Sequence, residues 1–374
     1  MPTPETAVGP AATPGAGDGM CAPIERVEVI DLAEGPLPAG DDRYAVAVHA
    51  AGDTGYFGPI GDLVAALVRA GLGEQALGHP VGDHRGLHRR LTDLLGAHGG
   101  GLGAWAIGAI DCAVWDLHGR LAGRPVGELL GGQATSGGAR VPAYASWLGK
   151  DLAQPGIRAD VTRVAGEGYL FTKWGLRRDP AHSPGRAAAL MAAAVERASA
   201  WAGGPVAVDA LGTWQESASM LFAGRVDPAA LYWLEDPLED SDVGSYADLT
   251  WQYALPLALG ERISTPRHAA QLLTGTTLAA FIVDAAWCGG ITAAVDLVHL
   301  ARAWGVALYP HGRALAPALH LAWAYPDVIP AVEYQLQWEP RRQALFTTGL
   351  QPSRGHIRVP DAPGLGRTPL RAAR

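Results

Sequence analysis

Five short apolar runs in the second half of the chain each end in a single ionisable residue. These residues are Asp209, Glu235, Glu261, Asp284 and His311, and they follow one another at intervals of 26, 26, 23 and 27 residues. Each interval has room for one strand, one helix and two loops, so the pattern predicts consecutive βα units with an ionisable group at each strand's carboxyl end. In a parallel barrel these ends meet at one mouth, and the five side chains would surround one cavity.

Three of these residues, Asp209, Glu235 and Glu261, would be carboxylates on adjacent strands. At about 4 Å, each pair would repel by roughly 4 kcal/mol at an effective dielectric constant near 20. A cation is therefore expected among them, and oxygen ligands of this kind suit Mg²⁺ or Mn²⁺. A single acid at a strand end is commonly a cap or an ion-pair partner, but three acids in register favour a metal site.

Asp284 and His311 indicate that the site could also transfer a proton. They would end neighbouring strands, so the carboxylate could bind one imidazole nitrogen and leave the other as a base that faces the cavity. The nearby anion also makes the ring more basic.

The motifs that contain these residues agree with one family in order, spacing and strand position. They are Asp209 followed by Ala-Leu-Gly-Thr-Trp, Glu235-Asp-Pro-Leu, Gly-Glu261-Arg, Asp284 followed by Cys-Gly-Gly-Ile-Thr, and Pro-His311-Gly. The chain resembles the enolase superfamily, in its mandelate racemase and muconate lactonizing enzyme branch, from about residue 22 to residue 370.

This resemblance implies a fold, a cofactor and an activity. The fold would be α/β: a (β/α)7β modified TIM barrel with an α+β capping domain. Magnesium would be held by the three acids, with manganese as a possible substitute, and a proton alpha to a substrate carboxylate would be abstracted. The His-Asp dyad would be His311 and Asp284, and the acidic group on the last strand, which assists the enolate, would be Glu333. The resemblance also implies a homo-oligomer, a dimer or an octamer.

One position departs from the family pattern. Many relatives carry Lys-x-Lys at the end of the second barrel strand, but here Lys173 is followed two positions later by Gly175. Glycine cannot move a proton, so we predict that two-base racemisation is absent and that His311 is the principal base. Lys173 would hold the substrate carboxylate or the enolate oxygen by its charge. A lysine with a lowered pKa that acts as a second base is the alternative.

The chain divides into three parts. Residues 1–21 are rich in Pro, Gly, Ala and Thr and are expected to form a flexible extension. Residues 22–138, completed by 350–374, would form the capping domain, and residues 139–349 the barrel. Within the cap, strands are expected at 24–32 and 44–50, joined by a polar loop that is either a substrate-selecting flap or an ordinary connection. A helix is expected at 104–121, where Asp111 and Asp116 would be ion-pair or capping groups.

Composition excludes several classes of protein. The net charge of −8, without any basic run interleaved with aromatic residues, argues against a nucleic-acid partner. No apolar run is long enough to span a membrane, and the start of the chain does not resemble a secretory signal. Three widely spaced cysteines make a disulfide framework improbable, which favours the cytoplasm.

Taken together, these features predict a lyase that acts on a small carboxylate, most simply the dehydration of an acid sugar. A one-base epimerase or cycloisomerase on the same scaffold and a non-catalytic metabolite-binding protein remain alternatives. Three tryptophans that follow predicted strands, Trp147, Trp174 and Trp287, are candidate substrate contacts, although such residues also pack between loops and barrel.

Overall fold

A computed structural model describes residues 19–33, 42–133, 138–238 and 243–372. The polar loop expected after the first strand lies outside these ranges at 34–41, as does the expected extension apart from η1 (Gly19–Cys21). No helix in the described ranges is long and apolar enough to cross a membrane.

The capping domain begins with a three-stranded antiparallel sheet. Its strands are β1 (Arg26–Asp31), β2 (Tyr44–Ala50) and β3 (Asp53–Ile60), in the order β1-β2-β3. Apolar residues alternate along β1, and β2 is buried along most of its length between its two neighbours. The first two strands lie where the sequence predicts them.

Helices and short helical turns follow this sheet in the cap. They are α1 (Asp62–Leu67), η2 (Val68–Leu72), η3 (Glu74–Ala76), α2 (His84–Leu95), η4 (Gly96–His98), α3 (Leu102–Leu121) and α4 (Val126–Leu129). Of these, α1, η2, η3 and α3 contact the strands of the sheet. The predicted single apolar face of α3 is incomplete, because this helix is buried nearly all round, between β3, α2 and the barrel helix α10 (Ile291–Trp304).

Two acids of α3 explain how it is held. Asp116 pairs with Arg120 at 2.7 Å, and Asp111 accepts bonds from the backbone N–H and hydroxyl of Thr292 at the start of α10. The ion-pair and capping roles predicted for these acids are confirmed. Gly108 allows α3 to lie close to the loop after the barrel residue Asp284, because a Cβ at position 108 would lie 2.0 Å from the carbonyl oxygen of Ala286.

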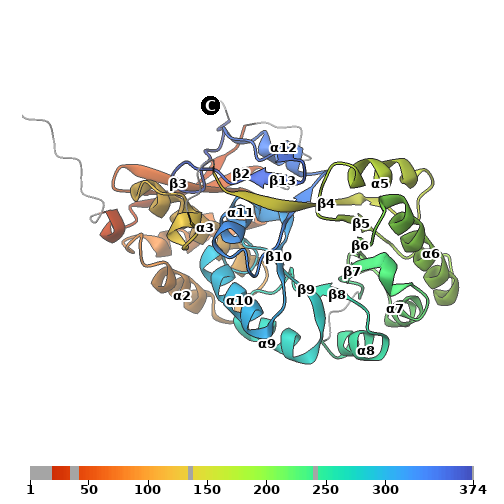
Figure 1. Ribbon diagram of the computed structural model, residues 1–374. Helices are drawn as coiled ribbons and strands as arrows, with labels where there is room; N and C mark the ends of the chain where they lie inside the picture. The colour runs from red at the N-terminus through yellow and green to blue at the C-terminus, as the bar shows by residue number, and fades with distance from the viewer. Residues whose placement is uncertain (1–18, 34–41, 134–137, 239–242, 373–374) are drawn as a thin grey trace, which may run out of the picture.

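The barrel contains eight parallel strands among the described residues, and Figure 1 shows helices along its outside. The strands are β4 (Arg140–Asp151), β5 (Thr172–Gly175), β6 (Val206–Asp209), β7 (Leu231–Glu235), β8 (Leu257–Leu259), β9 (Leu278–Val283), β10 (Leu308–Pro310) and β11 (Val332–Gln335). Neighbours in sequence pair from β4 to β10, and β11 pairs with β4, so that Glu333 lies opposite Tyr144.

One α-helix follows each barrel strand from β4 to β10. These helices are α5 (Ile157–Ala165), α6 (Pro184–Ala202), α7 (Glu216–Ala223), α8 (Val243–Tyr253), α9 (Pro266–Gly275), α10 and α11 (Leu315–Ala324), with short 3₁₀ turns η5 (Pro228–Ala230) and η6 (Gly312–Ala314). Each of Ser183, Asp227 and Thr265 precedes a proline, a pattern that predicts a helix N-cap. Thr265 accepts from the His268 N–H and Asp227 from the Ala229 N–H, but the prediction is wrong for Ser183, whose side chain makes no capping bond. The arrangement is the predicted (β/α)7β barrel.

The barrel interior is filled below its mouth. A separate buried cluster includes Tyr144, Phe171, Trp233 and Tyr309, whose rings meet by stacking and by edge contacts. This plug leaves only the carboxyl ends of the strands open for chemistry.

The C-terminal segment returns to the cap. It contains α12 (Glu339–Gln343), β12 (Pro352–Ser353) and β13 (His356–Arg358). Strand β13 pairs antiparallel with the start of β4, and Leu345 and Phe346 pack with Ile30, Leu32 and Ala47 of the cap sheet. In Figure 1 this blue segment lies beside the red and orange strands of the cap. Both ends of the described chain therefore meet at the cap.

Candidate active site

The strand ends bring the predicted residues to one mouth. Lys173 lies within β5, Asp209 and Glu235 are the last residues of β6 and β7, and Glu261 follows β8. Asp284 and His311 directly follow β9 and β10, and Glu333 lies in β11. Each of these side chains is at least 85% buried. The parallel register of the strands is what gathers them.

Lys173 is the centre of the charged cluster. Its ammonium nitrogen lies 2.8 Å from Glu235 Oε1, 3.1 Å from Glu333 Oε1 and 3.6 Å from Asp209 Oδ2. Burial alone would lower the pKa of Lys173, but these carboxylates raise it well above its ordinary value. The lysine is therefore held as a cation, which favours the electrostatic role over the role of a second base.

The structure also explains why the second lysine of the family pattern is missing. A Cβ at Gly175 would lie 2.9 Å from the carbonyl oxygen of Leu148 and 3.1 Å from that of Lys150. The long strand β4 continues to Asp151 and occupies the space that a side chain at position 175 would need. A second base on this strand would require the end of β4 to move.

Acidic side chains outnumber the single ammonium group around Lys173. Burial raises the pKa of Asp209 to about 6, against the opposing effect of Lys173 and with a further increase from Glu261. Burial likewise raises the pKa of Glu235 well above its ordinary value, and that of Asp236 to about 8, where Glu261 and Asp209 add to the effect. The sequence prediction did not include Asp236, which the repeated pattern does not distinguish because it directly follows Glu235.

These oxygens fit a hard divalent cation in their chemistry. In the described part of the chain, no group of three or more acidic, histidine or cysteine side chains is arranged so that it could hold a metal ion as it stands. The Lys173 ammonium instead binds Glu235 and lies close to Asp209. The assignment of Asp209, Glu235 and Glu261 as metal ligands therefore stays a prediction.

His311 and Asp284 form a close pair. The Nδ1 of His311 lies 2.7 Å from Asp284 Oδ2, and the other oxygen of Asp284 accepts from the backbone N–H groups of Ala286 and Trp287. Burial lowers the pKa of His311, but the bond to Asp284 and the charges of Glu333 and Glu261 outweigh this and raise it to about 9. Because a carboxylate only accepts hydrogen bonds, the Nδ1 carries a proton, and Nε2 can act as a base only in the neutral form of the ring.

Glu333 is ionised and holds other groups. Its Oε2 accepts from the Gly312 N–H at 2.7 Å, next to His311. Burial would raise the pKa of Glu333, but the charges of Lys173 and His311 lower it to about 2. As an anion it opposes negative charge on a substrate, so any assistance to an enolate would pass through the Lys173 ammonium that it holds.

A buried polar chain that the sequence prediction missed leads away from His311. The Nε2 of Gln335 lies 3.1 Å from His311 Nε2, and Gln335 Oε1 accepts from Arg342 at 2.8 Å. Arg342 also donates to Asp42 of the cap and to Glu339 of α12. Gln335 follows Glu333 by two residues on the same face of β11, which is the only sequence signal for it.

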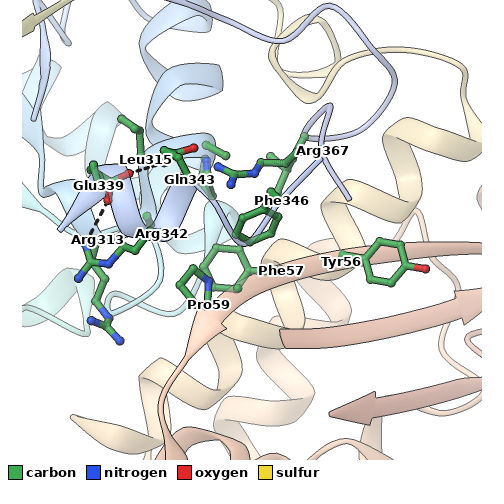
Figure 2. Close-up of a pocket in the computed structure, with 15 residues that line it drawn as sticks. Tyr56, Phe57, Pro59, Arg313, Leu315, Glu339, Arg342, Gln343, Phe346 and Arg367 are labelled. Carbon is green, nitrogen blue, oxygen red and sulfur yellow. Dashed lines mark hydrogen bonds and ion pairs between the residues drawn. The ribbon is translucent and has the colours of Figure 1, made fainter. Parts of the chain in front are cut away.

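Two residues of this polar network, Arg342 and Glu339, line a small cavity of about 20 Å³ between the cap and α12. Figure 2 shows Arg313, Arg342 and Glu339 on one side of it and Phe346 with Arg367 on the other. Arg313 also binds Asp42, at 2.8 Å. Asp42 of the cap therefore binds two arginines: Arg313, which lies shortly after His311, and Arg342, which contacts Gln335.

The three candidate tryptophans have different surroundings. Trp287 lies with its ring centre 4.9 Å from that of His311 and stacks on Trp105 of α3. Trp174 is fully buried and donates to Thr172, and Trp147 stacks near it beneath Lys150 and Arg163. They lie on the face of β4 and β5 opposite to that of Lys173 because side chains alternate along a strand. Only Trp287 of these three therefore remains a candidate substrate contact.

The arrangement defines a class of protein: a capped (β/α) barrel with a histidine-carboxylate pair and an excess of acids at its mouth. Residues 156–373 match the enolase C-terminal domain-like family, and residues 47–131 match the mandelate racemase / muconate lactonizing enzyme N-terminal domain. The chain belongs to the enolase superfamily, in the mandelate racemase and muconate lactonizing enzyme branch.

Individual relatives agree with this assignment. A D-galactonate dehydratase family member of Paenibacillus sp. (strain JDR-2) is 29% identical over 303 residues, which cover 70% of each chain. An L-talarate/galactarate dehydratase of Salmonella typhimurium is 29% identical over 277 residues, 73% of this chain and 65% of that protein, slightly under two thirds of its length. A mandelate racemase/muconate lactonizing protein from Paracoccus denitrificans, crystallised with magnesium, has a TM-score of 0.77 at 23% identity, over 93% of this chain and 96% of that one. This likeness confirms the predicted fold.

Proposed function

We propose that this protein is a magnesium-dependent carbon-oxygen lyase that dehydrates a hydroxylated carboxylate of the acid-sugar type. The observation that carries the proposal is the His311–Asp284 pair, at 2.7 Å, beside a buried cluster of acids around one ammonium group. The relatives named as galactonate and talarate/galactarate dehydratases, at 29% identity, support the same class of reaction.

Asp209, Glu235 and Glu261 would hold the magnesium ion. When bound, the ion supplies positive charge to the substrate carboxylate, which makes the hydrogen on the alpha carbon more acidic. The buried acids around Lys173 support this assignment, because burial raises the pKa values of Asp209 and Glu235 and a bound cation would favour their ionised forms.

His311 is the base of the proposed mechanism. Its Nε2 accepts the alpha hydrogen as a proton, and the electron pair of the C–H bond stays on the substrate as an enediolate. Asp284 holds the ring by its Nδ1–H and stabilises the imidazolium that forms. The ammonium of Lys173 offsets the negative charge of the enediolate.

Elimination then completes the reaction. The enediolate electrons form a double bond between the alpha and beta carbons while the bond to the beta hydroxyl breaks. The proton on His311 Nε2 leaves with that hydroxyl as water. This route requires the alpha hydrogen and the beta hydroxyl to lie on the same face of the substrate, next to His311.

The proposal is tested by turnover of a library of acid sugars in deuterated water, with and without Mg²⁺, followed by NMR. Loss of water supports the lyase, whereas deuterium exchange or inversion without loss of water indicates an epimerase, and ring opening a cycloisomerase. His311→Asn is expected to abolish exchange and elimination while keeping the fold, as checked by circular dichroism. Full turnover by that variant, or tight binding of a carboxylate without any exchange, would overturn the mechanism.

A further inference from the structure

A cavity of about 340 Å³ lies next to the candidate base, between the cap and the barrel mouth. Its walls come from the end of β3 and the start of α1, from the start of α3, and from the loop after β9. The lining is mostly apolar and includes Phe57, Ile60, Leu63, Leu102, Trp105 and Trp287. Its size is within the range of sites that bind small molecules.

Trp287 connects this cavity to the chemistry. Its ring stacks on Trp105 with centres 4.4 Å apart, and it lies 4.9 Å from the His311 ring by the same measure. Its backbone N–H also donates to Asp284, so the indole is fixed relative to the dyad. Trp287 and Arg313, which is two residues after His311, are parts of the lining close to the dyad, so the distal end of a substrate held at His311 would reach the cavity beside Trp287.

The lining decides which chemical group the cavity can accept. Each hydroxyl group that leaves water needs a new hydrogen-bond partner, or binding is weakened. Among the lining side chains only Asp62 and Arg313 are charged, and Arg313 already donates to Asp42. A polyhydroxylated chain would lose hydrogen bonds here, whereas an alkyl or aryl group would be stabilised by burial.

Two lining residues argue against a purely structural role for the apolar surface. Leu63 and Leu102 are 65% and 39% exposed, so they do not complete a core within the described residues. Apolar groups left open beside a catalytic pair are better explained by a ligand that covers them.

We infer that the substrate is a hydroxy acid that is hydroxylated at the alpha and beta carbons and carries an apolar group, alkyl or aryl, at its distal end. This inference rests on the proposed function for the position of the carboxylate end. It adds that the distal end occupies the cavity between Leu63, Leu102 and Trp287. It departs from the proposed acid-sugar type in one respect, because a fully hydroxylated sugar acid is expected to be the poorer substrate.

The test compares 2,3-dihydroxy-3-phenylpropanoate with six-carbon aldonates of matched stereochemistry at the alpha and beta carbons. With Mg²⁺ present, kcat/KM for elimination or alpha-deuterium exchange is expected to be about tenfold or more higher for the phenyl compound. Leu63→Asn and Leu102→Asn are expected to reduce this preference, whereas Leu190→Asn, on the exposed face of α6, leaves it unchanged. Equal turnover of both classes, or better turnover of the aldonates, would overturn the inference.

Calorimetric binding separates this inference from the proposed function. If neither class reacts but the phenyl compound binds more tightly, and Leu63→Asn removes that difference, the apolar subsite stands and the lyase assignment fails. If binding shows no preference, the subsite assignment fails whatever the turnover. Light scattering on Leu63→Asn supplies the last check, because a change of oligomeric state without a change of selectivity would make this face a subunit contact and overturn the inference.

Discussion

Lys173 contacts carboxylates from three strands, and its replacement therefore tests the charge balance of the mouth. In Lys173→Met, buried Glu235 and Glu333 lose their cation, which is expected to cost about 3 to 5 kcal/mol of unfolding free energy at pH 8. The loss should be smaller at pH 5, because the carboxylates can then take up protons. Added Mg²⁺ should restore part of the stability.

The measurement is the thermal unfolding midpoint with and without Mg²⁺. Lys150→Met is the matched control, because Lys150 pairs with Asp160 at the surface, where such pairs contribute roughly 0 to 1 kcal/mol. If both variants unfold at the wild-type temperature, the ammonium does not hold the acids together.

Gln335 is the second residue whose change is informative. In Gln335→Met the amide that contacts His311 Nε2 is lost, and Arg342 loses an acceptor. We expect kcat to fall by about tenfold or more with little change in KM, because the imidazole loses its fixed orientation. Gln252→Met, at an exposed position of α8, is the control. Wild-type kcat in Gln335→Met would show that the contact does not position the ring.

The difference between predicted and unpredicted residues has a simple physical cause. Asp209, Glu235, Glu261, Asp284 and His311 end strands, and the parallel register alone brings such positions together. Gln335, Arg342 and Asp42 meet only because the cap docks on the barrel, and the sequence carries no periodic signal for such contacts. Trp147 and Trp174 were candidates because they are near strand ends, but side-chain alternation turns them to the other face.

At the scale of elements, helix α3 and helix α10 are joined by a buried acid whose protonation affects stability. Burial raises the pKa of Asp111 from 3.8 to about 7. Between these two values the folded chain holds a proton that the unfolded chain has lost, so stability falls as the pH rises. From pH 5 to 7 this amounts to about 2 kcal/mol.

Replacement of this acid removes its pH dependence. Asp111→Asn cannot ionise, so its unfolding free energy relative to wild type should increase between pH 5 and 7 and change little above that range. Chemical denaturation at each pH measures the difference. A constant difference across the range would show that Asp111 is ionised in the folded protein throughout.

The predicted elements agree with the observed ones where hydrophobic periodicity is complete, as in the barrel strands and in residues 44–50. The prediction was weakest for α3, where one apolar face was expected. This helix is buried on several sides because the cap sheet, α2 and α10 all pack on it, and helical periodicity describes burial on one side only.

At the scale of the whole molecule, the late segment with β13 joins cap and barrel, so we expect them to unfold together. Ile357 is fully buried where β13 pairs with β4, and Ile357→Asp should lower the free energy of unfolding by about 4 kcal/mol or more in a single transition. His356→Asp, on the exposed side of the same strand, should have little effect. A separate early transition of the cap in calorimetry would contradict this view.

The pairing of β13 with β4 also bears on how the protein is made. A ribosome releases β4 long before residues 356–358, so the antiparallel edge of that strand stays without its partner while all the other barrel strands are synthesised. The nascent chain can assemble βα units in order, but the cap cannot be completed until the segment with β13 has been synthesised. Completion of the cap is therefore expected to follow the synthesis of all the barrel strands.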